Sequence, residues 1–219
     1  MNIALFDIDG TLTASNEIDS VCFADAFREV FQLEVDTNWD AYEHTTDRGI
    51  ATEALLRARG RQPSEHELSL HRSRFVQLLD ARMTDLHEIP GASAFLAQLL
   101  ARDWRIALCT GAWGDSARLK LARAGLPTNL PLASCDEEIS REAILRRGIA
   151  LVGGTGNDVV IAFGDATWDV DAAAKERLPF IGIASGTCAE KLRQRGATEV
   201  VEDFRDAAVP FAAIDRVTA

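Results

Sequence analysis

The chain has 219 residues, a formal net charge of −11 and 47% hydrophobic residues, so it is large and apolar enough to bury a full α/β core. The negative charge disfavours nucleic acid and anionic membranes as partners, because both bind clustered lysine and arginine. A small anionic substrate is compatible with this charge, because one bound metal ion can invert the local field.

The cysteines and the amino-terminal segment indicate a cytoplasmic protein. Four cysteines are scattered without a Cys-x-x-Cys pair, which favours reduced thiols over a disulfide framework or a zinc site. No basic and apolar leader precedes the first apolar segment, and no run of about 18 apolar residues is present. We therefore expect neither export nor a membrane span.

The first apolar run, residues 3–6, ends in Asp7 and Asp9 and is followed by Gly10. This pattern predicts a buried strand that breaks into a turn at its C-terminal end. Side chains alternate along a strand, so the two acids start on one side and can face a common pocket. Two carboxylates about 4 Å apart repel by roughly 4 kcal/mol at an effective dielectric of about 20. Either one of them is protonated, or a positive group lies between them.

Helical periodicity follows for some seventy residues without a strand pattern. Apolar residues recur at i, i+3, i+4 and i+7 in two stretches, and Ser64 with Glu67 forms a capping-box signature before a third. The two stripes are Phe23, Ala26, Phe27 and Val30, and then Ala51, Ala54, Leu55 and Ala58. We predict that residues 14–88 form a helical domain inserted into a second domain made of residues 1–13 and 89–219.

From Pro90 onward, predicted helices and strands alternate. Uninterrupted apolar strands are expected at residues 105–109, 159–163 and 180–184, with shorter pieces at 132–135 and 200–201. Apolar strands separated by helices are typical of a parallel sheet covered on both faces, in which ligands bind beyond the C-terminal strand ends. Asp7, Thr110 and Asp165 each stand at such an end.

The residues at these ends resemble, in order, motifs of the haloacid dehalogenase superfamily. The sequence Asp7-Ile-Asp9-Gly-Thr-Leu is similar to the first motif, Thr110 with the following glycine to the second, and Gly-Asp165-x-x-x-Asp169 to the fourth. The likeness spans the whole chain. It implies a Rossmann-like parallel sheet core with helices on both faces and an inserted α-helical cap domain.

The resemblance also implies a role for each motif residue. Asp7 would be the nucleophile that forms an aspartyl-phosphate, and Asp9 the general acid and then the general base. The hydroxyl of Thr110 and the backbone N–H of Gly111 would hold the transferring phosphoryl group.

The implied cofactor is Mg²⁺, which is commonly bound by one or two carboxylates together with substrate phosphate and water. Its ligands would be the side chains of Asp7 and Asp165 and the backbone carbonyl of Asp9, with Asp169 binding directly or through water. The ion would also relieve the repulsion among these acids.

The third motif departs from the common family pattern, which has a lysine. The matching place offers Arg141, which keeps the charge and can bind phosphate or carboxylate in a bidentate manner. Lys120 on the preceding helix competes for this role; the alternative interpretation is a solvated lysine on a helix face.

In the family, a helical insert at this position closes over the core as a cap and contacts the rest of the substrate. The polar loop at residues 44–49 is the candidate to face the site, and Arg48 could meet a second anionic group there. Trp113 and Trp168 follow motif residues and either line the pocket or pack in the core. His66, His71 and His87 are isolated, which favours surface positions.

These features predict a Mg²⁺-dependent phosphatase that acts on a small phosphorylated metabolite. A sugar-phosphate mutase of the β-phosphoglucomutase type is the alternative, because it would share every core residue. Asp9 disfavours a dehalogenase, and the absence of lysine from residues 14–88 disfavours Schiff-base chemistry. A non-catalytic relative would usually lack one of the four motif carboxylates, and all four are present. The sequence leaves the substrate and the oligomeric state open.

Overall fold

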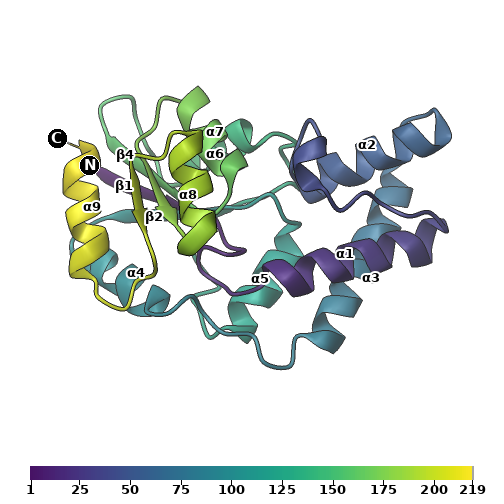
Figure 1. The fold of residues 1–219 in the computed structure, drawn as a ribbon, viewed down its shortest axis with the longest axis horizontal. Helices are drawn as coiled ribbons and strands as arrows, with labels where there is room; N and C mark the ends of the chain where they lie inside the picture. Colours follow the sequence, from purple (N-terminus) through teal and green to yellow (C-terminus); the bar gives the residue numbers. More distant parts are fainter. Residues whose placement is uncertain (219) are drawn as a thin grey trace.

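A computed structural model describes residues 1–218 as a parallel sheet flanked by helices, with three further helices beyond one edge of the sheet (Figure 1). The strands are β1 (Asn2–Phe6), β2 (Arg105–Cys109), β3 (Leu132–Ala133), β4 (Val159–Gly164), β5 (Phe180–Ile183) and β6 (Glu199–Val201). The α-helices are α1 (Asn16–Phe31), α2 (Asp47–Arg59), α3 (Glu65–Arg82), α4 (Ala92–Ala101), α5 (Gly114–Arg123), α6 (Arg141–Leu151), α7 (Thr167–Lys175), α8 (Gly186–Arg195) and α9 (Ala208–Thr218), and a 3₁₀ turn spans Trp39–Ala41. The expected α/β fold with inserted helices is confirmed.

The strand order explains why distant residues meet. The six-stranded sheet runs β3-β2-β1-β4-β5-β6, so the first strand of the sequence lies at its centre. Phe6 at the end of β1 pairs with Leu108 of β2 on one side and with Phe163 of β4 on the other. All pairs are parallel, so the C-terminal ends of these three strands lie at the same edge of the sheet.

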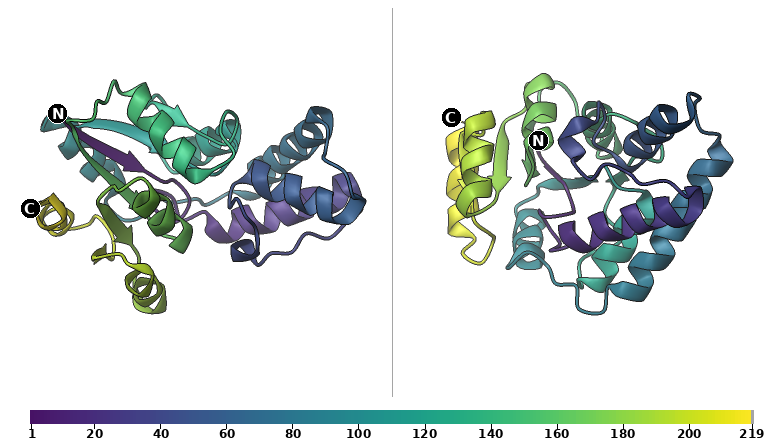
Figure 2. Two further views of the ribbon diagram at one scale, coloured as in Figure 1. Left: turned by 90° about the horizontal axis from the view of Figure 1, so that it is seen from above. Right: turned by 45° about the vertical axis from the view of Figure 1, so that its right-hand side comes forward.

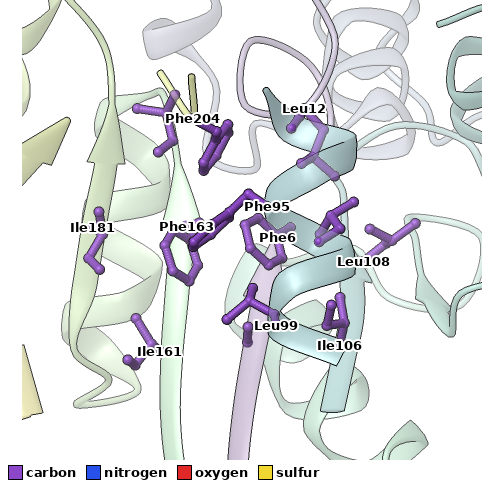
Figure 3. Close-up of a cluster of buried hydrophobic side chains, with 14 of the residues drawn as sticks. Phe6, Leu12, Phe95, Leu99, Ile106, Leu108, Ile161, Phe163, Ile181 and Phe204 are labelled. Carbon is purple, nitrogen blue, oxygen red and sulfur yellow. The ribbon is translucent and has the colours of Figure 1, made fainter. Parts of the chain in front are cut away.

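The strands are apolar at successive positions because helices cover both faces. In β1, Ala4 and Phe6 belong to a cluster that includes residues of α4, α5 and α9, whereas Ile3 and Leu5 belong to one that includes residues of α6, α7 and α8. Figure 3 shows the first cluster, in which the ring of Phe6 stacks on that of Phe163 with centroids 4.4 Å apart. Burial on this scale, at roughly 25 cal/mol per Å² of apolar surface, fixes the strand ends in place.

The inserted helices α1, α2 and α3 lie together beside the sheet (Figure 2). They have a hydrophobic cluster of their own, built around α1 and α3. Phe27 and Phe75 are fully buried in it, and Trp113 and Cys135 from the sheet domain complete it. The predicted capping box at the start of α3 is confirmed, because the Ser64 hydroxyl accepts from the backbone N–H of Glu67 and the Glu67 carboxylate accepts from the backbone N–H of Ser64. Within residues 1–218, no helix combines the length and apolar character that a membrane crossing requires.

His71 is fully buried, so the predicted surface position is wrong. Its ring lies 4.5 Å from that of Phe23, and its Nε2 lies 3.2 Å from the backbone oxygen of Phe23. His71 follows Leu68 by three positions and precedes Phe75 by four, which places it on the buried stripe of α3. Burial lowers the pKa of His71 to about 4.

This histidine is expected to weaken the fold in mild acid. In the unfolded chain, histidine binds a proton with a pKa of about 6.5. Because the folded protein binds this proton only near pH 4, the free energy of unfolding is highest above pH 6.5 and falls as pH decreases towards 4. From pH 7 to pH 5, the free energy of unfolding should fall by about 2 kcal/mol more in the wild type than in His71→Leu. Urea titrations at both pH values measure this difference. An equal decrease in the wild type and in His71→Leu would contradict the lowered pKa of His71.

Candidate active site

Three carboxylates converge at the C-terminal edge of the sheet. Asp7 follows β1, Asp165 follows β4, and Asp169 lies in the first turn of α7; one oxygen of each lies within 4.8 Å of the others. Gly10 makes this approach possible, because a Cβ at its position would lie 2.0 Å from Oδ2 of Asp165. Its φ of +78° also favours glycine.

The chemistry of this group fits a divalent cation. Burial and the neighbouring Asp169 carboxylate raise the pKa of Asp7 well above its ordinary value, despite the opposing charge of Arg141. The same causes raise the pKa of Asp165 to about 7. An all-oxygen set of this kind suits hard ions such as Mg²⁺, and a cation held between the three would offset both the burial cost and the repulsion.

Arg141 lies where the sequence predicted, beside the acids. It is the first residue of α6, and its Nη1 lies 3.3 Å from Oδ1 of Asp7 and 2.6 Å from Oδ1 of Asp169. Its Nε donates to the backbone oxygen of Thr45, 3.0 Å away, so the inserted segment helps to hold the guanidinium. The free side of the guanidinium can meet an anion bound at Asp7.

Lys120 is fully buried, so its interpretation as a solvated lysine on a helix face is wrong. Its Nζ lies 2.7 Å from both carboxylate oxygens of Asp9 and 2.6 Å from Oδ1 of Asp19 on α1. Burial alone would lower the pKa of Lys120, but the nearby carboxylates, led by Asp19, raise it above its ordinary value. Its two carboxylate partners come from distant segments, the turn after β1 and helix α1 of the insert.

The second-motif residues lie at the same edge. Thr110 is buried, and its Oγ1 accepts a hydrogen bond from the backbone N–H of Ala112 at 3.1 Å. A Cβ at Gly111 would lie 2.7 Å from Nη2 of Arg141 and 2.9 Å from the backbone oxygen of Thr45, so this position has no room for a side chain.

A cavity of about 480 Å³ opens between these strand ends and the inserted helices α1 and α2. From the sheet domain it is lined by Asp7, Asp9, Thr110, Gly111, Ala112, Arg141, Asp165, Ala166 and Trp168, and from the insert by Asn16, Glu17, Asp19, Ser20, Phe23, Trp39, Thr45, Asp47 and Ile50. Arg48 is not in this lining. Its guanidinium donates to the carboxylate of Glu65 and to the backbone oxygen of Asp136.

The order and spacing of these residues match a known family. The Haloacid dehalogenase-like hydrolase family matches residues 4–183, most of the chain. The chain belongs to this family. The assignment made from the four motifs is confirmed, as is the expectation of a hydrolase of the phosphatase class.

Relatives of this haloacid dehalogenase-like chain include phosphatases. A phosphoglycolate phosphatase of Cereibacter sphaeroides is 28% identical over 183 residues, which cover 78% of this chain and 79% of the relative. A hydrolase from Pseudomonas syringae has a similar structure, with a TM-score of 0.75 at 19% identity, covering 95% of this chain and 96% of that one. The β-phosphoglucomutase of Clostridium difficile also has a TM-score of 0.75, at 16% identity and full coverage of both chains, and shows the shared fold.

Thr45 and Asp47 of the loop predicted to face this haloacid dehalogenase-like site do line the cavity, but the sequence interpretation singled out none of its three inserted acids, of which Glu17 is the first. Asp19 lies in the first turn of α1, and Asp47 is the first residue of α2, with its Oδ2 accepting from the backbone N–H of Trp113 at 2.9 Å. Acids are common in the first turn of any helix because they interact favourably with the helix dipole, so neither stood out. The structure also separates the two tryptophans, since Trp168 lines the cavity and Trp113 packs in the core of the insert.

Proposed function

We propose that this protein is a Mg²⁺-dependent phosphatase that hydrolyses a small phosphate monoester through an aspartyl-phosphate on Asp7. The observation that carries this proposal is the meeting of Asp7, Asp165 and Asp169 within 4.8 Å, beside the guanidinium of Arg141. A nucleophile, a cation site and an anion-binding group therefore surround one point at the mouth of the cavity.

The first half-reaction uses groups on both sides of that point. The Asp7 carboxylate attacks phosphorus, and the bond from phosphorus to the leaving oxygen breaks. Asp9 gives a proton to that oxygen, so the leaving group departs as a neutral hydroxyl. Arg141, the Thr110 hydroxyl and the backbone N–H of Gly111 stabilise the charge on the phosphoryl oxygens.

The second half-reaction restores the enzyme. Asp9, now a carboxylate, takes a proton from a water molecule that attacks the phosphorus of the aspartyl-phosphate. The acyl phosphate bond breaks, inorganic phosphate leaves, and Asp7 returns as a carboxylate. Lys120 and the Ser15 hydroxyl bind the Asp9 carboxylate and hold it in a defined orientation.

Asp7, Asp165 and Asp169 would hold the metal ion, and the backbone carbonyl of Asp9 remains a proposed fourth ligand. When bound, Mg²⁺ would neutralise phosphate charge and fix the orientation of the substrate. The match between an acidic, crowded, oxygen-only site and the preference of Mg²⁺ for carboxylates and phosphate supports this choice of ion.

We propose that residues 14–88 act as a cap over a core formed by residues 1–13 and 89–219. The cap supplies half of the residues that line the cavity, most of them from helices α1 and α2. Such a cap limits the water that reaches the site and contacts the part of the substrate beyond the phosphate. The cavity volume of about 480 Å³ suits a small metabolite.

Release of inorganic phosphate from p-nitrophenyl phosphate tests the activity. We expect turnover with Mg²⁺, loss of turnover in excess chelator and recovery when Mg²⁺ is restored. Mg²⁺ should also raise the melting temperature, because a ligand at 100 times its Kd stabilises the folded state by about 2.7 kcal/mol. Turnover that persists in chelator would contradict the proposal, and an isomer in place of inorganic phosphate from a sugar phosphate would favour a mutase.

Two variants on neighbouring segments separate a specific metal site from general charge. Asp165→Asn should lose most of the thermal shift caused by Mg²⁺, because it removes one of the three carboxylates. Asp171→Asn is the matched control, because Asp171 pairs with Arg195 and lies outside the group formed by Asp7, Asp165 and Asp169. This variant should keep the thermal shift of the wild type. Equal shifts in both variants would contradict the proposed ligand set.

A further inference from the structure

We infer that the leaving group of the substrate carries an ammonium group and has no carboxylate or second phosphate. This inference rests on the proposed phosphatase activity and names the class of phosphate monoester that the cavity accepts. It follows from the charged and aromatic side chains that line the cavity together with the proposed phosphate-binding residues.

The cavity has no cation left for a second anion. Among the lining residues in the described chain, Arg141 is the only lysine or arginine, and it is engaged with Asp7 and Asp169 at the phosphate end. Lys120 lies behind the lining and is bonded to both Asp9 and Asp19. The guanidinium of Arg48, which the sequence offered for this purpose, pairs with Glu65 instead.

The leaving-group side of the cavity is acidic. Glu17 and Asp19 of α1 line it, and Asp47 of α2 lines the same cavity beside Gly111, whose backbone oxygen accepts from the backbone N–H of Asp47 at 2.8 Å. Lys120 carries one positive charge and pairs with two carboxylates, those of Asp9 and Asp19. Negative charge therefore exceeds positive charge here even before Glu17 is counted. A bound ammonium group would offset that excess, whereas a second anion would add to it.

Burial strengthens this preference. Burial raises the pKa of Asp19 to about 6 against the opposing effect of Lys120, and burial with the nearby Asp19 raises the pKa of Asp47 well above its ordinary value. The positive charge of Lys120 therefore offsets only part of the cost of burying these two carboxylates. A ligand that supplies such charge gains from both, because charges interact more strongly away from water.

Aromatic rings complete the acidic side. Phe23 and Trp39 from the insert line the same cavity, whereas the ring of Trp168 from α7 already lies 5.6 Å from the Arg141 guanidinium carbon. The rings of Phe23 and Trp39 pack edge to face, with centroids 5.6 Å apart and an angle of 78°. An ammonium group within about 6 Å of such a ring is attracted by the negative face of the π-system, most strongly by tryptophan. Acids and rings together suit an organic cation, whereas neither suits a carboxylate.

Three esters with a two-carbon leaving group isolate this effect: O-phosphoethanolamine, 2-hydroxyethyl phosphate and phosphoglycolate. They end in an ammonium, a hydroxyl and a carboxylate, respectively. Each is used as a competitor of p-nitrophenyl phosphate turnover with Mg²⁺ in low salt. We expect the Ki of O-phosphoethanolamine to be at least tenfold lower than that of phosphoglycolate, with 2-hydroxyethyl phosphate between them. The ratio should shrink as salt is added, because salt screens the charges.

Glu17→Gln tests the acidic side directly. This variant should lower the ratio of the phosphoglycolate Ki to the O-phosphoethanolamine Ki about fivefold, because it removes one carboxylate from the lining. Glu29→Gln is the matched control on the same helix: it changes the net charge equally, but Glu29 pairs with Arg74 and lies outside the cavity. We expect its ratio to equal that of the wild type.

The outcomes separate the two proposals. If p-nitrophenyl phosphate is not hydrolysed with Mg²⁺, the proposed function is contradicted, and this inference with it. If it is hydrolysed but phosphoglycolate competes as well as O-phosphoethanolamine or better, only the ammonium inference is contradicted. The same holds if Glu17→Gln and Glu29→Gln change the ratio equally.

Discussion

Asp7→Asn is expected to lower kcat by roughly 10⁴-fold or more, because an amide cannot replace the carboxylate that attacks phosphorus. The fold should survive, since the change removes one of three buried, mutually repelling acids. Phosphate release and thermal unfolding, measured on the same preparation, check both parts. Turnover of more than about one per cent of the wild type by a folded variant would contradict the role of Asp7.

Asp9→Asn provides a comparison that shows whether the intermediate forms. p-Nitrophenolate leaves without a proton from the enzyme, so Asp9→Asn should still transfer the phosphoryl group to Asp7 from this ester. Without the general base, the aspartyl-phosphate should then persist. We expect a burst of about one p-nitrophenolate per enzyme followed by slow turnover, and no burst in Asp7→Asn. A burst in both variants would assign the phosphoryl group to another residue.

Lys120→Met is expected to lower the free energy of unfolding by about 3–5 kcal/mol. The side chain is fully buried between Asp9 and Asp19, so its removal leaves two partly buried carboxylates without a counter-charge. Methionine has a similar volume, and the loss therefore reports charge more than packing. Urea unfolding measures the difference.

The loss should depend on pH in a defined direction. The pKa of Asp19 is already raised to about 6, and without Lys120 it would rise further. A carboxyl whose folded pKa exceeds its unfolded value destabilises the fold as pH rises through that range. The Lys120→Met deficit should therefore be larger at pH 8 than at pH 5.5.

Lys175→Met is the matched control, because Lys175 is an exposed lysine that pairs with Glu142. Exposed pairs contribute about 1 kcal/mol or less, so this variant should unfold almost as the wild type does. Similar losses in the two methionine variants would show that Lys120 is not the buried counter-charge of the acids.

Local sequence patterns were sufficient for the secondary structure near the site. The apolar run before Asp7 predicted β1, and the capping box at Ser64 predicted the start of α3, because both depend on residues within one or two turns. The acids at the ends of β1 and β4 could be expected to meet, because parallel strands present their C-terminal ends at one edge.

The same patterns gave the wrong burial for residues that are covered by segments distant in the sequence. Lys120 looked solvated and His71 looked exposed, yet both are fully buried. Helical periodicity shows which residues share a face, but not what packs on that face. The covering segments lie far away in sequence: Asp9 precedes Lys120 by 111 positions.

The amino-acid sequence by itself determined the order of helices and strands, the family and the acids of the proposed metal site, since these follow from short-range periodicity and from motifs at strand ends. Only the tertiary structure decided which cations reach those acids: Arg141 meets Asp7, Lys120 meets Asp9, and Arg48 pairs away from the cavity. It also brought Glu17 and Asp47 of the inserted helices into the lining of the cavity. The energy of an ion pair depends on distances of a few ångströms between charged groups. These distances are set by the packing of segments that lie far apart in the sequence.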